Sequence, residues 1–138
     1  MSEPTRATID VEVRYVETDQ MGVVHHANYL VWFELARTGL CRLTGHHYAD
    51  VERLGYRLMV TAAELRYRRG ARYGETVQVG CWIERLGSRG IRFAYEVRRD
   101  GTVLATGATE HVWVEIASGK PCRTPVPIAA PFAELAGR

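Results

Sequence analysis

The sequence predicts an α+β domain in which one long central helix is wrapped by an antiparallel sheet of about five strands. Three observations predict it: one amphipathic helical segment near the N-terminus, alternating apolar segments over most of the remaining chain, and short turn signals between them. Successive hairpins make the sheet antiparallel, so the helix must bury its apolar stripe against one sheet face. With 138 residues, 46% of them hydrophobic, the chain suits a single domain over residues 1–138.

The first elements follow from two different hydrophobic periods. Residues 9–15 alternate between apolar and polar, which predicts a half-buried strand that ends with Tyr15. A turn at Gly22 follows. A helix is then predicted from about Ala27 to Leu43, because apolar residues recur at steps of three and four. The predicted stripe consists of Tyr29, Trp32, Phe33, Ala36, Leu40 and Leu43.

The rest of the chain is predicted to supply the sheet. A short helix over residues 48–55 precedes strands that extend to about residue 116, with "RDG" at 99–101 as a hairpin signal. The tail "TPVPIAAPFAEL" is punctuated by prolines and is expected to cover a sheet edge. Open sheet edges promote pairing between chains, so we expect a homo-oligomer, either a dimer or a tetramer of dimers.

Composition argues against several classes of protein. A net charge of +2 is too small for a nucleic-acid-binding surface. No apolar run approaches the ~18 residues of a membrane span, and the polar start "MSEPTRATID" lacks a signal-peptide core, so a cytoplasmic protein is expected. The three cysteines form no CxxC and the histidines lack the spacing of a helical zinc pair, so no metal is expected.

The segment "RYRRGAR" at 66–72 is the densest basic cluster, with four arginines and no acid. A solvated strand end is the favoured interpretation. A phosphate-binding segment is the alternative, because arginine binds phosphate in a bidentate manner.

The stretch "DQMGVVHHANY" at 19–29 carries more chemistry than a connection needs. Asp19 is an acid that can attack a carbonyl or activate water. His25 and His26 lie where the helix should begin, and backbone N–H groups there have no partner within the helix. They can therefore point at a developing oxyanion. The alternative is structural: Asp before a helix is commonly a cap or turn residue, and a histidine there is commonly a surface residue.

At these residues the sequence resembles a known family. "RYVETDQMGVVHHANYLVWFELAR" is similar to the signature of hotdog-fold acyl-CoA thioesterases of the 4-hydroxybenzoyl-CoA thioesterase group. The similarity continues through "RYGETVQV", "IRFAYEV" and "EHVWVEIASGKPCRTP", which covers nearly the whole chain. The resemblance implies a hotdog fold and hydrolysis of an acyl-CoA thioester without a cofactor, at a site between subunits.

The resemblance also implies roles for single residues. Asp19 matches the catalytic carboxylate, which acts as nucleophile or general base. His26 matches the position whose backbone N–H polarises the thioester carbonyl, and its side chain is expected to orient water or the leaving thiolate. Gly22 matches the turn glycine that lets the backbone approach the substrate.

Three further residues are candidates for substrate binding. Tyr15 matches an aromatic residue near the site, although a core strand position is the alternative. His25 occupies a position often held by an aromatic residue, so which histidine faces the site stays open. Arg89 is the candidate contact for a coenzyme A phosphate from its place in a loop, and an exposed turn arginine is the alternative.

Two other functions stay open at this point. One is hydration of an enoyl thioester, which also occurs on the hotdog fold, and the other is binding of acyl-CoA without catalysis. The identity of the acyl group does not follow from the sequence.

Overall fold

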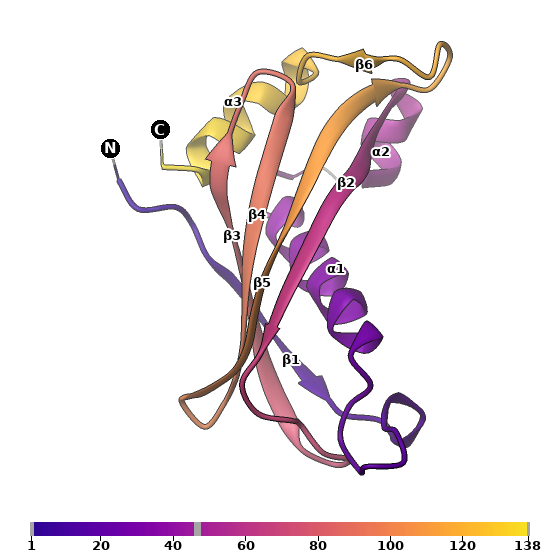
Figure 1. Ribbon diagram of the computed structural model, residues 1–138. Helices are drawn as coiled ribbons and strands as arrows, with labels where there is room; N and C mark the ends of the chain where they lie inside the picture. Colours follow the sequence, from indigo (N-terminus) through magenta and orange to yellow (C-terminus); the bar gives the residue numbers. More distant parts are fainter. Residues whose placement is uncertain (1, 46–47, 138) are drawn as a thin grey trace.

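The computed structural model describes residues 2–45 and 48–137, and these form an α+β structure with a six-stranded antiparallel sheet (Figure 1). The elements in chain order are β1 (Ala7–Glu12), a short 3-10 helix η1 (Tyr15–Glu17), α1 (Ala27–Arg42), α2 (Tyr48–Arg53), β2 (Tyr56–Tyr67), β3 (Thr76–Leu86), β4 (Gly90–Arg99), β5 (Thr102–Glu115), β6 (Pro121–Cys122) and α3 (Val126–Leu135). None of the described helices is both long and apolar enough to span a membrane.

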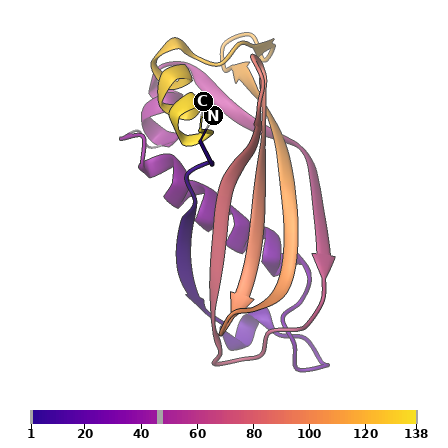
Figure 2. The ribbon, with the colours of Figure 1, turned by 90° about the vertical axis from the view of Figure 1, so that its left-hand side faces the viewer.

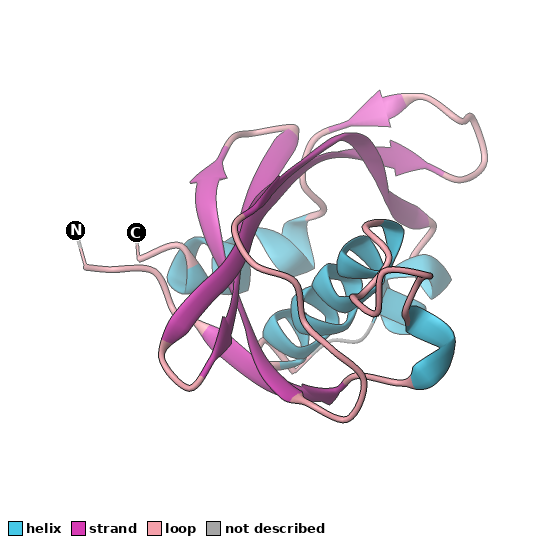
Figure 3. Ribbon diagram, turned by 60° about the horizontal axis from the view of Figure 1, so that its bottom comes forward, coloured by secondary structure: helices cyan, strands magenta, loops and turns pink. Residues whose placement is uncertain are grey.

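The strands lie in the order β1-β3-β4-β5-β2, and the short β6 pairs with β5. The sheet curves around α1, as the view along the helix shows (Figure 3). Strand β2 ends this order, so one of its edges pairs with β5, and the other, its free edge, has no strand beside it among the described residues. Figure 2 shows β2 as the outermost strand on the right, and the end of β2 lies beside the start of α1, where Tyr67 contacts Tyr29.

The predicted apolar stripe explains why α1 lies in the hollow of the sheet. Trp32, Phe33 and Leu40 are completely buried. The ring of Phe33 stacks on that of Tyr95 in β4, with centroids 4.3 Å apart. A Cβ atom at Gly107 in β5 would lie 2.5 Å from Phe33 Cε2, so only glycine lets the helix approach this closely. The helix is confirmed to begin at Ala27.

Parts of the predicted fold need correction. The first strand ends at Glu12, and Tyr15 lies in η1 with 77% of its surface exposed, so its assignment as a core strand residue is wrong. The central helix α1 has 16 residues, α2 lies within the short helix predicted over residues 48–55, and α3 is a further helix that the sequence does not predict. The proline-rich tail forms α3, whose buried apolar side chains are Ile128, Phe132 and Leu135. This helix contacts β3.

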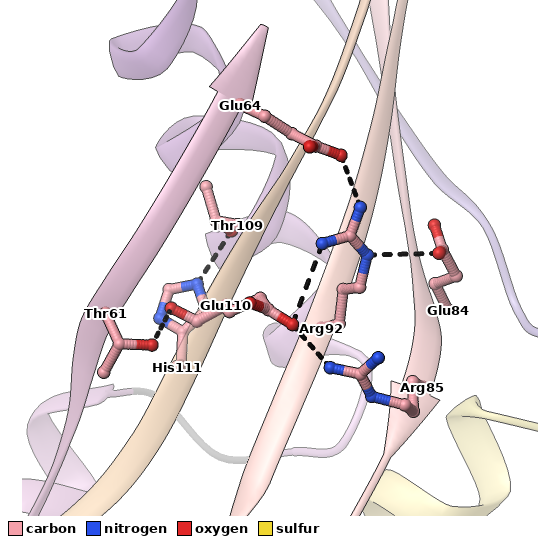
Figure 4. A network of polar contacts seen from close by, with 8 residues as sticks. All are labelled: Thr61, Glu64, Glu84, Arg85, Arg92, Thr109, Glu110 and His111. Carbon is pink, nitrogen blue, oxygen red and sulfur yellow. Dashed lines mark hydrogen bonds and ion pairs between the residues drawn. The ribbon is translucent and has the colours of Figure 1, made fainter.

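The outer face of the sheet, away from α1, carries a network of paired charges (Figure 4). Arg92 in β4 forms ion pairs with Glu64, Glu84 and Glu110, which come from three neighbouring strands. Arg85 also pairs with Glu110. The arginines of this network therefore have acidic partners within the chain.

Candidate active site

Asp19 lies in a tight turn between η1 and α1. Its backbone N–H donates to Val23 O (2.9 Å), its carbonyl accepts from Gly22 N (3.0 Å), and its Oδ1 accepts from Met21 N (2.8 Å). Gly22 has a φ of +80°, a backbone conformation that favours glycine. One carboxylate oxygen of Asp19 therefore stabilises the turn, as the structural interpretation predicts. The other has no hydrogen-bond partner in the described part of the chain.

A buried carboxylate two residues earlier fixes this turn to the helix. Glu17 is 3% exposed and accepts hydrogen bonds from Arg14 N (2.8 Å) and Trp32 Nε1 (2.9 Å). Its backbone carbonyl accepts from His25 N (2.8 Å) and Asn28 Nδ2 (3.0 Å). Burial alone would raise the pKa of Glu17, but the hydrogen bonds from Arg14 and Trp32 outweigh burial and hold this pKa below its usual value.

The two histidines at the start of α1 use their backbone groups differently. The His25 N–H is committed to Glu17, and the His25 Nδ1 accepts from Ala27 N (3.3 Å). His26 has helical dihedral angles (φ −53°, ψ −35°). Its N–H has no hydrogen-bond acceptor among residues 2–45 and 48–137. The helix therefore begins with one backbone donor left available at His26, where the helix dipole is positive.

Asp19 lies between two open pockets. The larger, about 800 Å³, is lined by Tyr15, Asp19, His25 and Asn28, together with Val16, Thr18 and Gln20. The smaller, about 270 Å³, is lined by Asp19, Val24, His26, Tyr29, Tyr67, Arg68, Arg69 and Gly70. The structure thus brings Tyr15 and His25 together with Asp19 on one side, and His26 with Asp19 on the other.

Arg89 lies far from these residues within one chain. Glu12, at the end of β1, pairs with Thr76 at the start of β3, so this end of the sheet is the Asp19 end. Strand β3 then runs ten residues to Leu86 before the turn that holds Arg89. At about 3.3 Å per residue, the two ends are roughly 30 Å apart. The coenzyme A role of Arg89 stays a prediction, and in a single chain Arg89 cannot share a pocket with Asp19.

A third pocket, about 320 Å³, lies farther along α1, where Glu34, Arg37 and Trp113 are among its lining residues. Arg37 is buried and donates to Tyr95 Oη (3.0 Å). This pocket holds none of the residues of the Asp19 turn.

Comparisons with known proteins show the family of this chain. The family model of the thioesterase-like superfamily matches residues 13–132, which include the turn, α1 and every strand of the sheet except β1. The chain belongs to this superfamily. A putative acyl-CoA thioesterase, YneP, of Bacillus subtilis is 41% identical over 113 residues, which cover 81% of this chain and 82% of YneP.

Two more relatives extend the match. The acyl-CoA thioester hydrolase YbgC of Escherichia coli O157:H7 is 29% identical over 88% of this chain and 92% of its own length. The crystal structure of a DHNA-CoA thioesterase from Staphylococcus aureus aligns with a TM-score of 0.91 and 31% identity, over 96% of this chain and 92% of that one. The prediction of a hotdog-fold thioesterase is confirmed, and the chain is a thioester hydrolase by family.

Sequence reasoning missed two parts of this candidate site. Glu17 is missed because its partner Trp32 is fifteen residues away. Arg68 and Arg69 were favoured as a solvated strand end, and the structure places them beside Asp19. In both cases the contact that matters joins residues far apart in sequence, and only the folded chain shows it.

We predict that Glu17→Gln destabilises the thioesterase through one mismatched hydrogen bond. The glutamine amide places an NH2 group where one carboxylate oxygen of Glu17 accepts a hydrogen bond. The donor at that position, either Arg14 N or Trp32 Nε1, then loses its acceptor. The free energy of unfolding should fall by about 2 kcal/mol. Trp32→Phe removes one of the two donors, so the double variant should lose less than the sum of the single losses in urea unfolding. If the losses of unfolding free energy in the two single variants simply added up in the double variant, the hydrogen bond between Trp32 and Glu17 would not contribute as proposed.

The same carboxylate predicts a pH dependence of stability. Because the pKa of Glu17 is lower in the folded than in the unfolded protein, its contribution is present above the unfolded value of 4.5 and is lost as pH falls through the folded value. The stability difference between wild type and Glu17→Gln should therefore be largest near neutral pH and shrink below 4.5. Urea unfolding at a series of pH values measures it, and a constant difference would contradict it.

Proposed function

We propose that this chain hydrolyses acyl-CoA thioesters, with Asp19 as general base or nucleophile and the His26 N–H as the oxyanion donor. One observation carries the proposal. An Asp19 carboxylate with a free oxygen and a helix N-terminus with a free N–H line the same pocket. The names of YneP, YbgC and the DHNA-CoA thioesterase support coenzyme A as the thiol of the substrate.

The chemistry needs a nucleophile and a place for negative charge. As general base, Asp19 takes a proton from water, whose oxygen attacks the thioester carbonyl carbon. As nucleophile, Asp19 attacks that carbon itself, loss of the thiolate leaves an acyl anhydride with Asp19, and water then hydrolyses this anhydride. Both routes place negative charge on the carbonyl oxygen, where the His26 N–H and the helix dipole stabilise it. The C–S bond then breaks, and coenzyme A leaves as the thiolate.

The test is a panel of substrates with the wild-type protein. Aromatic, short-chain and long-chain acyl-CoAs are assayed for thiol release, and an enoyl-CoA is assayed for loss of its conjugated double bond. We expect thiol release from at least one class, with the best substrate indicating the acyl group. Thiol release no faster than in buffer would contradict the proposal, and loss of the double bond alone would favour the hydratase alternative.

We also propose a homodimer formed through β2. The free edge of this long strand is flanked by exposed apolar side chains on β2 and α1, namely Met59, Val60, Leu30, Val31 and Leu35. Such an edge is normally covered in native proteins. A twofold antiparallel pairing of β2 would carry the Arg89 turn of one protomer toward the Asp19 end of the other. The Arg89 prediction requires this arrangement.

Light scattering tests the dimer. The expected mass is twice the 15.6 kDa of one chain. Replacing Val60 and Val31 by glutamate should shift the protein toward monomer, because two apolar positions of the proposed interface become charged. A wild-type protein that remains monomeric at micromolar concentration would contradict the proposal.

A further inference from the structure

We propose that Arg68, Arg69 and Arg72 form an anion-binding wall of this site, which holds a negatively charged group of the thioester substrate. The inference rests on the proposed thioesterase function and adds to it the charge of the substrate.

The segment that carries these arginines is fixed against the catalytic turn. Val24 N donates to Ala71 O (2.9 Å), and Tyr67 Oη donates to His26 O (3.3 Å). Gly70 lies so close to Val23 that a Cβ atom there would be 2.6 Å from Val23 Cγ1. The backbone of residues 67–71 is therefore held beside the turn that carries Asp19.

From this fixed backbone, the side chains of the wall extend to the surroundings of Asp19. Arg68 and Arg69 line the pocket that also contains Asp19 and His26. The Nη1 of Arg72 is 3.6 Å from where a Cβ of Gly22 would lie, so its guanidinium lies beside Gly22 in the turn that carries Asp19. Arg66, the remaining arginine of the segment, lines a pocket on the outer face of the sheet and is not part of the wall.

The wall has no counter-charge of its own. Among residues 2–45 and 48–137, no carboxylate lies within ion-pair distance of the guanidinium groups of Arg68, Arg69 or Arg72, and Asp19 is no exception. The arginines on the outer face differ, since Arg85 and Arg92 are paired with glutamates (Figure 4). Three unpaired cations at a reaction site form a positive surface that attracts an anionic ligand.

Guanidinium groups bind phosphate and carboxylate through the same paired N–H donors. An acyl-CoA carries phosphates on its coenzyme A portion, and some acyl groups carry a carboxylate. The wall recognises the charge they share, and substrates that bear only one of these groups distinguish the source.

The experiment compares Arg68→Gln/Arg69→Gln with wild type on three thioesters. Benzoyl-CoA carries only the phosphates, glutaryl-pantetheine carries only an acyl carboxylate, and benzoyl-pantetheine carries neither. We expect KM to rise roughly tenfold on benzoyl-CoA, on glutaryl-pantetheine or on both, with kcat little changed, and no change in KM on benzoyl-pantetheine. The thioester whose KM rises identifies the anion. Added salt should raise the wild-type KM for that substrate more than the variant KM.

One single variant serves as the control. Arg42→Gln removes an exposed arginine at the end of α1, away from the site. The wall is overturned if the double variant leaves every KM unchanged, or raises the KM for benzoyl-pantetheine equally. It is also overturned if Arg42→Gln reproduces the loss. Hydrolysis of benzoyl-pantetheine by wild type shows that the thioesterase function stands even where the wall fails.

Discussion

His26→Pro is expected to lower thiol release by roughly 10²–10³-fold while the protein stays folded. Proline removes the backbone N–H that we assign to the oxyanion, together with the imidazole. The φ of His26 is −53°, close to the value that the proline ring fixes, and its N–H makes no hydrogen bond within the described chain. Proline is also tolerated at the start of a helix, where N–H groups lack partners. Steady-state thiol release from the best acyl-CoA measures the effect, with urea unfolding to verify the fold.

His26→Ala is the matched control, because it removes the imidazole and keeps the N–H. If the backbone donor carries the effect, the alanine variant retains most of the activity that the proline variant loses. Equal losses in both variants would assign the effect to the imidazole and contradict the oxyanion assignment.

Asp19→Asn is expected to lower turnover at least ~100-fold, because the amide can neither take a proton from water nor attack the thioester. The asparagine oxygen still accepts the hydrogen bond from Met21 N, so the turn should survive. Thiol release and urea unfolding measure activity and fold on the same preparation. The substitution should leave the free energy of unfolding within about 1 kcal/mol of wild type.

Asp10→Asn is the control for Asp19→Asn. Asp10 is an exposed carboxylate on β1 that lines none of the pockets of the site. The Asp10→Asn variant should keep the turnover of the wild-type protein. Retained activity in the Asp19 variant, or a loss that only follows unfolding, would remove Asp19 from the mechanism.

The helix and the sheet could be predicted because each follows from a local period. The spacing of Tyr29, Trp32, Phe33 and Leu40 alone requires a helix that is buried along one side, and the structure buries all four. The prediction failed where tertiary contacts override the pattern. The alternation of apolar and polar residues continues through Tyr15. The strand nevertheless ends before Tyr15, because the hydrogen bond from Arg14 N to the Glu17 carboxylate turns the chain there.

The proline-rich tail is expected only to cover a sheet edge, and its folding into α3 depends on tertiary packing. Proline is compatible with the first turn of a helix, and the burial of Ile128, Phe132 and Leu135 stabilises α3 despite Pro131 in its interior. The free energy that packing contributes to α3 depends on residues of other elements. Phe132, for example, contacts Trp113 in β5, which is distant in sequence.

The candidate site likewise combines residues that are close in sequence with residues that only the fold brings together. Asp19, His25 and Tyr15 are neighbours in sequence, and the structure brings them to one pocket. Arg68 and Arg69 lie forty residues farther along the chain and reach the site only because β2 ends beside the start of α1. Arg89, chosen for its loop, lies at the other end of the sheet, since a loop position says nothing about which end it occupies.

The most direct test of the account follows the oxygen atom that hydrolysis adds. The wild-type protein is given its best acyl-CoA substrate over many turnovers in water enriched in the heavy oxygen isotope, and the products are weighed by mass spectrometry. The account predicts one free acid for each thiol released, with one heavy oxygen in its carboxylate, and almost no product with Asp19→Asn. Consumption of the substrate without free acid, or labelled acid formed equally well by the Asp19 variant, would contradict it.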